Sequence, residues 1–422
     1  MNKTDSASPK DYLPAREAIG ILEIREQTLY AYVSRGWIRS VTQPGRKDRL
    51  YLREDVEKMR HRSLARSGHG VVAASAMYWG EPIIPTSITE ITPAGPLYRG
   101  HNAIELAREG VSYEAAAELL WTGVRPEGTP RWRANAARVA RVVKLAGGIP
   151  APQANDQLME MFALFALQLG MSRGSVERRV REGSTFDAAR ELIQTFTGCF
   201  GYISPRRSFM PMRSGQPMVE GLIAALGIED SEENRIALQS ILVLFADHEL
   251  SPSVFSARVT ASTGGSLHSC VASAVCANTG LLVGRQYDQI EDFLARASTR
   301  SVLARRAQEC QERGAAVPGF GHPFYVDGDP RALLLVELAK QRKKQSKRLE
   351  AIYGFMEDAQ AALGLHPRHE LAVITLAIAM DLPAHSAGAL FSLARTAGWI
   401  AHVQEQRASG LMLRPRAKFI RD

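Results

Sequence analysis

Residues 317–323 of this 422-residue chain read VPGFGHP, and the tripeptide DPR follows at 329–331. Proline and glycine are so dense here that the stretch predicts a rigid turn. The turn presents His322, and Arg331 follows nine residues beyond it. A lone histidine is more often a satisfied core residue than a catalyst, so the turn has to be interpreted together with the other unusual stretches of the chain.

Two further stretches differ from ordinary helix surface. Residues 246–249 read ADHE, which places His248 between two carboxylates at the end of an apolar helix. Near the C-terminus, Arg395 lies within an apolar helical pattern and Arg414 within the tripeptide RPR. Guanidinium groups bind carboxylates through paired hydrogen bonds. Two imidazoles and three guanidiniums therefore predict a site for a small polyanion such as a dicarboxylate.

Helical periodicity dominates the chain after residue 110, whereas strand-like alternation is confined to 83–91. We expect an all-α domain of about 340 residues, because apolar residues recur at helical spacing over most of that length. The predicted helices cover 113–121, 131–145, 157–169, 186–196, 217–225, 234–245, 266–282, 289–297, 333–359, 370–380 and 386–406. Residues 67–81 are small and low in charge, and they predict a linker before this domain.

The composition limits the class of protein. With 45% hydrophobic and 23% charged residues, the chain is not disordered, collagenous or a disulfide miniprotein, and its length suits two domains. The four cysteines form no CxxC pair, so we expect a reducing cytoplasm and no metal site. Neither an N-terminal signal nor an apolar run of the roughly 20 residues needed to cross a bilayer is present, so no membrane association is expected.

The first 66 residues carry fourteen Lys or Arg against nine Asp or Glu, an imbalance that suggests an anionic partner. Helical periodicity over 15–22 and 27–35 is followed by Gly36, which predicts the end of the second helix. Two hairpin arms, 37–41 and 50–52, then flank a basic turn, and 53–62 predicts a closing helix.

This order of elements in residues 1–66 resembles the winged helix-turn-helix domain of the MerR and excisionase type. The resemblance implies that one set of side chains faces DNA or RNA, namely Arg25, Gln27, Tyr30, Tyr32 and Arg35. It also implies that Arg46, Lys47 and Arg49 on the wing contact phosphates. The alternative is a protein-docking module whose basic residues form a solvated face.

Residues 82–419 resemble citrate synthase. The matching segments are Tyr98-Arg99-Gly100, ADHE at 246–249, VPGFGHP with the arginine of DPR, AGW at 397–399 and RPR at 414–416. The resemblance implies a mainly helical fold over residues 82–422. It also implies a small subdomain at roughly 285–385 inserted into a large one, and an obligate homodimer.

The same resemblance implies a substrate site. His248, His322, Arg331 and Arg395 would hold a 2-oxo dicarboxylate such as oxaloacetate, and Arg414 would reach in from the second subunit. Val317, Pro318, Gly319, Phe320 and Gly321 would present backbone groups to the adenine of coenzyme A, whose thioester is a co-substrate rather than a tightly bound cofactor. The basic run at 340–348 either meets the coenzyme A phosphates or is a solvated helix face.

Two positions differ from the family pattern. The family's GPLHG segment supplies a histidine that donates to the thioester oxygen, but residues 280–284 read GLLVG, which places Val283 there. The family's base is an aspartate, and counting back from Arg395 gives Glu370, with Asp381 as a second candidate. Because valine cannot donate a hydrogen bond, either Arg285 or a water replaces the histidine, or the condensation is lost.

Two functions therefore compete. In the first, an acyl-CoA enolised by Glu370 attacks the carbonyl of oxaloacetate or a related 2-oxo acid, which His322 polarises, and hydrolysis releases coenzyme A. A variant of this reaction uses a different acyl-CoA or runs in the cleavage direction. In the second, the fold is a catalytically inactive sensor of a dicarboxylate or coenzyme A ester that regulates an N-terminal DNA-binding module. Retention of a carboxylate at position 370 favours the enzyme.

Overall fold

The computed structural model describes residues 12–22, 24–34, 37–42, 49–53, 55–57, 59, 84–133, 136–145, 152, 155–174, 186–280, 282–295, 299–322 and 324–415. The chain divides into two compact units. One comprises Met1–Pro85 together with Pro415–Asp422, and the other comprises Thr86–Arg414. The predicted linker at 67–81 lies outside the described residues.

In its described residues, the N-terminal unit contains the helices α1 and α2, further helical residues at 53, 55–57 and 59, and a small antiparallel sheet. Its elements are β1 (Tyr12–Pro14), α1 (Ala15–Leu22), α2 (Glu26–Ser34), β2 (Ser40–Thr42) and β3 (Arg49–Leu52), with the strands in the order β1-β3-β2. In the register, Tyr51 of β3 lies opposite Leu13 of β1 and Ser40 of β2. Leu13, Tyr51 and Leu29 of α2 belong to one buried apolar cluster, so the sheet and the helices share a core.

Tyr32 of α2 contributes to that core. Its ring is half-buried and lies 5.6 Å from the ring of Trp37. Because this packing covers part of the ring, Tyr32 is less accessible than an exposed side chain, and its contact with a nucleic acid stays a prediction. Arg25, Gln27 and Tyr30, by contrast, are exposed at the beginning of α2. Arg35, Arg46 and Lys47 lie outside the described residues.

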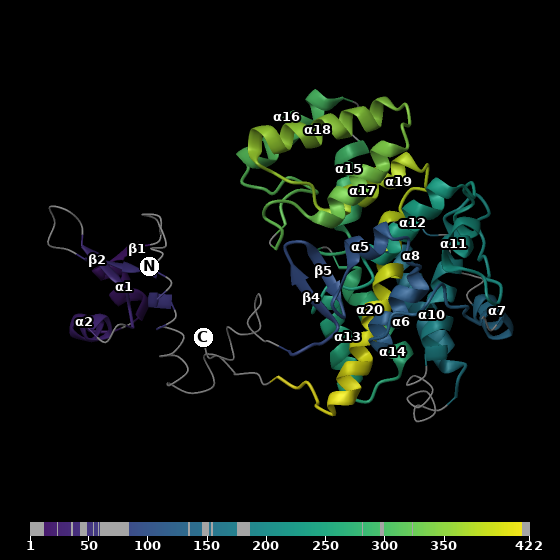
Figure 1. Ribbon diagram of the computed structural model, residues 1–422, viewed down its shortest axis with the longest axis horizontal. Coiled ribbons are helices and arrows are strands. Elements are labelled where there is room, and N and C mark those ends of the chain that lie inside the picture. Colours follow the sequence, from purple (N-terminus) through teal and green to yellow (C-terminus); the bar gives the residue numbers. More distant parts are fainter. Residues whose placement is uncertain are drawn as a thin grey trace. The chain divides into compact units, whose positions relative to one another are not determined.

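The larger unit is a helical assembly with a three-stranded antiparallel sheet (Figure 1). The strands, in the order β4-β5-β6, are β4 (Thr89–Thr92), β5 (Gly95–Tyr98) and β6 (His101–Asn102). The helices before residue 280 are α5 (Ala103–Arg108), α6 (Tyr113–Thr122), α7 (Ala136–Leu145), α8 (Asn155–Met171), α10 (Phe186–Cys199), α11 (Met218–Leu226), α12 (Glu232–Leu244), α13 (Pro252–Ser262) and α14 (Leu267–Asn278), with a 3-10 turn η2 (Phe200–Tyr202). The later ones are α15 (Gln286–Ala295), α16 (Arg300–Glu312), α17 (Pro330–Gln341), α18 (Lys347–Leu363), α19 (His369–Ala379) and α20 (Ala387–Ser409).

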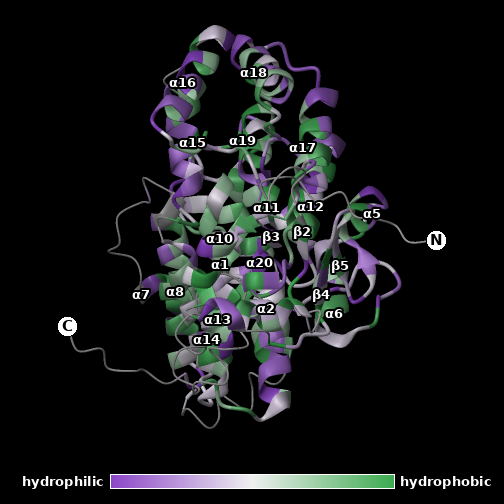
Figure 2. Ribbon diagram, turned by 90° about the vertical axis from the view of Figure 1, so that its left-hand side faces the viewer, coloured by the Kyte–Doolittle hydropathy of each residue, from purple (hydrophilic) through white to green (hydrophobic). Residues whose placement is uncertain are grey.

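Helix α20 is the central element of this unit. It packs against α6, α8, α10, α12, α13 and α14, and even its polar residues Ser392, Thr396 and His402 are fully buried. Helices α15–α19 gather in one region, at the top of Figure 1. Within this group α16 is coloured hydrophilic over much of its surface in Figure 2, and it buries only Leu303 and Ala307. Among the described residues, no helix is long and apolar enough to cross a membrane.

Several predicted elements need correction. The predicted helix over 333–359 is two helices, because Lys343 adopts a left-handed backbone (φ 48°) and Ser346 caps the start of α18. The helix predicted over 266–282 ends at Asn278. The strand predicted over 83–91 begins only at Thr89. Helices α5, α13 and α16 were not predicted.

Candidate active site

The end of α12 positions His248. The hydroxyl of Tyr98, at the end of β5, lies 3.0 Å from the carbonyl oxygens of both Val243 and Leu244. The single Tyr98 O–H is shared between these carbonyls at the end of the helix. Asp247 is fully buried and accepts a hydrogen bond from His402 of α20, at 3.2 Å. The backbone that carries His248 is thus fixed on both sides.

The turn that presents His322 is attached to the segment before α19. Gly321 donates its N–H to the carbonyl of His366 (3.0 Å), and Arg368 donates its N–H to the carbonyl of Gly319 (2.8 Å). The backbone of Gly319 is left-handed (φ 82°), and a Cβ atom there would lie 2.9 Å from Cβ of Leu371. Glycine is therefore required for the turn to approach α19 this closely.

These two backbone hydrogen bonds determine the position of Glu370 and occupy two polar groups of the turn. They bring Glu370, which follows Arg368 by two residues, next to the histidine turn. They also use the Gly319 carbonyl and the Gly321 N–H, so these two groups are already paired within the chain. Val317 and Phe320 are buried. Pairing thus limits which backbone groups of 317–321 remain for the adenine of coenzyme A.

Arg331 is held at the start of α17 by Asp329. The Asp329 carboxylate caps the helix by accepting from the Arg331 N–H at 3.0 Å, and it also accepts from Nε at 3.0 Å and Nη2 at 2.7 Å. The Arg331 guanidinium lies over the rings of Phe245 and Tyr325. Burial opposes both charges, but the pairing with Asp329 raises the pKa of Arg331, and Arg331 lowers the pKa of Asp329. Both groups are therefore ionised.

The two predicted histidines lie together. Their ring centroids are 6.1 Å apart, and Tyr325 contacts both, with its hydroxyl 3.3 Å from Nε2 of His248 and its ring centroid 4.8 Å from that of His322. Burial, and then Arg331, lower the pKa of His322 to about 4 and hold the pKa of His248 well below its usual value. Both imidazoles are therefore neutral at neutral pH.

The proton of neutral His322 can be assigned. Its Nδ1 atom accepts a hydrogen bond from the backbone N–H of Phe324 at 3.1 Å. A neutral imidazole that accepts at one nitrogen carries its proton on the other. His322 therefore offers Nε2–H as a donor toward a ligand.

Arg395 is the most unusual charge in the site. Its side chain is 3% exposed and its guanidinium lies 4.8 Å from the ring centre of Phe391. Within the described part of the chain, Nε and Nη1 of Arg395 and Nη1 of Arg331 have no hydrogen-bond partner. Burial lowers the pKa of Arg395, although Asp247 partly offsets that effect. Unpaired buried guanidinium groups are costly unless a ligand pairs with them, so they indicate an anion site.

Glu370 lies at the first turn of α19 and is fully buried. Its carboxylate accepts from Nε and Nη2 of Arg368, at 3.1 and 2.7 Å, and lies 3.4 Å from Nδ1 of His369. Burial would raise the pKa of Glu370, but His369 and Arg368 together lower it below the usual value. Glu370 is consequently a carboxylate at neutral pH.

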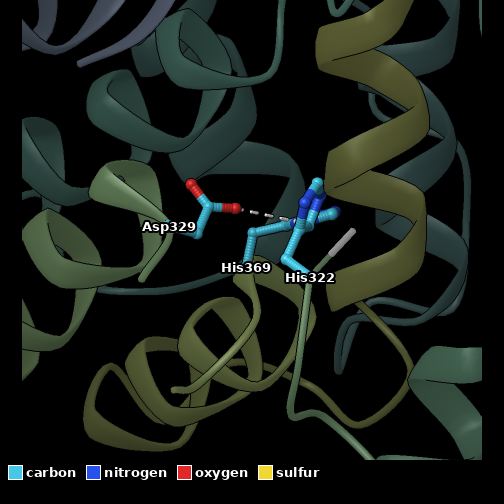
Figure 3. Close-up of side chains that lie close together, drawn as sticks. All are labelled: His322, Asp329 and His369. Atoms are coloured by element: carbon cyan, nitrogen blue, oxygen red, sulfur yellow. Dashed lines mark ion pairs between the residues drawn. The ribbon is translucent and has the colours of Figure 1, made fainter. Parts of the chain in front are cut away.

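His322, Asp329 and His369 have ligand atoms within 4.8 Å of one another, and Figure 3 shows the three side chains with the contact between Asp329 and His369. This spacing would suit a metal ion. Both Asp329 oxygens, however, already accept hydrogen bonds from Arg331, whose positive charge repels a cation. The arrangement therefore suits an anion better than a metal.

Two other candidates, Arg414 and Asp381, are exposed and lie outside this cluster. Arg414 is exposed, and the residues before it are attached to α13 through a hydrogen bond from Leu413 N–H to the hydroxyl of Ser262. About 21 Å of helical rise separates Arg395 from Ser409, so Arg414 does not reach the same cluster within its own chain. Asp381 is exposed and pairs with Lys344, so it does not fit the role of a buried base.

The structure adds residues that sequence reasoning missed. Tyr325, Asp329, Arg368 and His369 each contact a predicted site residue, as shown above. Asp329 carried a signal, because Asp before Pro is a common start of a helix. Tyr325 carried none, since its role depends on the contact of its hydroxyl with His248, which is distant in the sequence.

Comparison with known proteins agrees with this geometry. Residues 77–416 match the family model described as "Citrate synthase, C-terminal domain". A 2-methylcitrate synthase from Shewanella oneidensis is 28% identical over 382 residues, which cover 84% of this chain and 95% of the relative. A citrate synthase from Haloferax volcanii is 29% identical over 344 residues, which cover 77% of this chain and 90% of the relative.

Solved structures share the fold. Citrate synthase from Thermotoga maritima superposes with a TM-score of 0.66 at 23% identity, covering 81% of this chain and 94% of that one. A ternary complex of citrate synthase from Thermoplasma acidophilum with carboxymethyl coenzyme A and oxaloacetate superposes with a TM-score of 0.65 at 20% identity, covering 81% and 95%. With its mainly helical fold and a family match over most of its length, this chain belongs to the citrate synthase family.

Proposed function

We propose that the protein condenses a short acyl-CoA, acetyl-CoA or propionyl-CoA, with oxaloacetate to give a citrate-type product and coenzyme A. The observation that carries the proposal is the pair of buried guanidiniums, Arg331 and Arg395, with N–H groups that lack a partner among the described residues. The names of two relatives, a 2-methylcitrate synthase and a citrate/2-methylcitrate synthase of Bacillus subtilis, support propionyl-CoA as an alternative acyl donor.

The site residues divide the binding of oxaloacetate between them. Arg331 and Arg395 pair with its carboxylates, while Nε2–H of His322 donates to the keto oxygen. His322 is a neutral donor because its pKa is about 4, so it polarises the carbonyl without transferring a full charge. His248 and Tyr325, joined at 3.3 Å, enclose the same space and supply further hydrogen bonds.

The carbon–carbon step then requires a base. The Glu370 carboxylate removes a proton from the carbon next to the thioester, and the C–H electron pair forms an enolate whose negative charge is on the former carbonyl oxygen. The enolate carbon attacks the keto carbon of oxaloacetate, and the C=O electron pair moves onto the keto oxygen. This oxygen takes the Nε2 proton of His322, which is restored from solvent as Glu370 releases the proton that it removed. Hydrolysis of the resulting thioester releases coenzyme A. Because the pKa of Glu370 is lowered, proton removal is uphill and the enolate oxygen needs a donor.

Coenzyme A is proposed to bind at the turn formed by residues 317–321. The Gly319 carbonyl and the Gly321 N–H of this turn are already paired, and the Phe320 N–H also donates to the Val317 carbonyl, at 3.2 Å. Groups of the turn outside these three hydrogen bonds would meet the adenine. The basic run at 340–348 is the second candidate for its phosphates. Lys340 lies 3.3 Å from Glu357, and Lys344 pairs with Asp381, which supports a solvated face over a phosphate site for these two lysines.

We also propose that Arg414 completes the site of a second subunit in a homodimer. Its exposure and its separation from Arg395 in its own chain support this role. Co-expression of Arg414→Ala and Arg395→Met subunits tests it, because a hybrid dimer then contains one intact site. Each variant alone is expected to be inactive, and the mixture to recover about a quarter of the wild-type sites. A mixture as inactive as its parents would contradict the shared site.

Thiol release tests the condensation. Purified protein is mixed with oxaloacetate and acetyl-CoA or propionyl-CoA, and free coenzyme A is measured together with the product by mass spectrometry. We expect thiol release that depends on oxaloacetate. If neither thioester is consumed although calorimetry detects oxaloacetate binding, the condensation proposal fails and the sensor alternative gains support.

The N-terminal unit is proposed to contact a nucleic acid through the exposed start of α2. Arg25, Gln27 and Tyr30 are exposed there, and the Tyr30 hydroxyl donates to Glu26 at 2.7 Å. Filter binding to duplex DNA at several salt concentrations tests this. Arg25→Ala should weaken binding and reduce the salt slope by about 1. Binding that does not change with salt would indicate protein docking instead.

A further inference from the structure

Tyr287 lies on α15, a helix that packs against α19, which carries Glu370. It is the second residue of α15, and α19 begins at His369. The close approach at Gly319 involves both helices, because a Cβ atom there would contact Leu371 of α19 and lie 3.4 Å from Ile290 of α15. The first turns of the two helices therefore belong to one packed region with the histidine turn.

The surroundings of the Tyr287 side chain are those of the proposed substrate site. Its ring centroid is 5.8 Å from that of Phe391. Phe391 in turn lies 5.5 Å from the ring of His369 and beneath the guanidinium of Arg395. Tyr287 is 2% exposed, and among the described residues its hydroxyl has no hydrogen-bond partner. Leaving a buried hydroxyl unpaired is unfavourable, so a partner for it is expected to arrive with a ligand.

The charges that act on this hydroxyl are those of the same site. Burial raises the pKa of Tyr287 well above its usual value, the negative charge of Glu370 raises it further, and Arg395 partly opposes the increase. Tyr287 is therefore a neutral phenol that is able to donate throughout the working pH range.

We propose that the Tyr287 hydroxyl donates a hydrogen bond to the thioester oxygen as the acyl group enolises, and so supplies the donor that Val283 lacks. Val283 lies four residues before Tyr287. The N–H of Gln286 donates to the Val283 carbonyl at 3.4 Å, so a hydrogen-bonded turn connects the two positions. Arg285, the side chain first considered for this role, is exposed. As Glu370 takes the proton from the carbon, the electron pair moves onto the thioester oxygen, and Tyr287 stabilises the charge that develops there. This inference rests on the proposed condensation.

Tyr287→Phe tests the proposal, because it removes only the hydroxyl and keeps the ring against Phe391. Thiol release with oxaloacetate should fall about 100- to 1,000-fold, the loss typical of one oxyanion donor. Calorimetric affinity for oxaloacetate and the melting temperature should not decrease. Tyr202→Phe is the matched control, since Tyr202 is a half-buried tyrosine whose ring packs 6.4 Å from Phe209, and it should retain wild-type turnover.

Enolisation is measured separately by deuterium uptake. The protein is incubated in D2O with acyl-CoA and malate, a diacid without a keto group to attack, and the deuterium in recovered acyl-CoA is quantified. Tyr287→Phe should slow this exchange in parallel with turnover. Undiminished exchange or undiminished turnover in the variant would overturn the role of Tyr287 while the condensation stands. An absence of thiol release from the wild-type protein would instead overturn the condensation, and the donor role with it.

Discussion

Replacing Arg395 with methionine should make the unliganded protein more stable while it abolishes the binding of oxaloacetate. Arg395 is 3% exposed, and two of its guanidinium nitrogens have no partner within the described residues. Methionine carries no charge and replaces the aliphatic part of the arginine side chain, so the substitution removes the unpaired groups and leaves the space of the guanidinium open. The usual rule that substitutions in a core destabilise is therefore reversed at this position.

The magnitude follows from the contacts. Two unpaired buried N–H groups cost about 1–3 kcal/mol each, and the contact with the Phe391 ring returns up to about 2 kcal/mol. The two groups together cost about 2–6 kcal/mol, so the net gain on substitution is about 0–6 kcal/mol, with a central value of about 3 kcal/mol. For a unit the size of residues 86–414, about 1 kcal/mol corresponds to roughly 1.5 °C in Tm. We therefore expect the melting temperature to rise by about 4 °C, the value at the centre of that range.

Arg258→Met provides the matched control. Arg258 of α13 is buried to the same degree, at 2% exposure. Its Nε donates to Gln406 at 3.0 Å, and its Nη1 donates to Glu405 at 2.7 Å and contacts His402 at 3.1 Å. Removing this arginine leaves charged and polar partners unpaired, at a cost of about 3–5 kcal/mol. Its melting temperature should fall where that of Arg395→Met rises.

Calorimetric melting and oxaloacetate titration of the two variants distinguish an anion-binding role of Arg395 from a structural one. Arg395→Met should lose at least about 30-fold in oxaloacetate affinity, since truncating one partner of a buried charge pair costs 2–5 kcal/mol. If Arg395→Met melts as far below wild type as Arg258→Met does, Arg395 has structural partners. If it binds oxaloacetate normally, the anion site lies elsewhere. Either result refutes the reasoning.

Three further outcomes are expected. Glu370→Gln should lower kcat for thiol release by at least 100-fold without a loss of oxaloacetate affinity, because the amide cannot remove a proton; a turnover close to that of wild type would identify a different base. His322 has a folded pKa of about 4, below the roughly 6.5 of an unfolded histidine, so the unfolded state binds more protons between these values and stability falls as pH falls from 6.5 toward 4. Urea unfolding at neutral and mildly acidic pH should show a smaller acid loss for His322→Gln than for wild type, and equal losses would contradict the assignment. Gly319→Ala should destabilise more than Gly321→Ala, because both backbones are left-handed but only the former places a Cβ 2.9 Å from Leu371; equal melting temperatures would show that the turn moves aside.

The sequence predicted helices best where one face of the helix is apolar. The expected helix at 113–121 is observed as Tyr113–Thr122, and that at 386–406 as Ala387–Ser409. Helix α13 was missed because its serine, threonine and alanine residues give its two sides a similar polarity. Helix α16 was missed because only two of its residues are buried. The break between α17 and α18 at Lys343 was missed because the charged residues of this segment fit a helix surface as well as a turn.

The candidate site was predictable only as a set of residue types. Imidazoles and guanidiniums in a chain with few other candidates indicated an anion, and the structure places His248, His322 and Arg331 in one cluster. Which of these groups are paired within the chain was not predictable, because pairing depends on contacts between segments far apart in the sequence. Asp329 pairs with Arg331 locally, whereas the environment of Arg395 depends on how α20 packs against the end of α12.

The buried arginines of this unit differ in how completely the chain pairs them, and that difference separates structural from ligand-binding roles. Arg258 donates to three side chains of α20 and fixes α13 against it. Arg331 donates twice to Asp329, which orients its guanidinium, and retains Nη1 without a partner among the described residues. Arg395 has two such nitrogens. A diacid brings the acceptors that these three N–H positions lack. Because the same diacid supplies negative charge where Arg395 is least compensated, oxaloacetate is expected to bind before the acyl-CoA and to complete the site in which Glu370 acts.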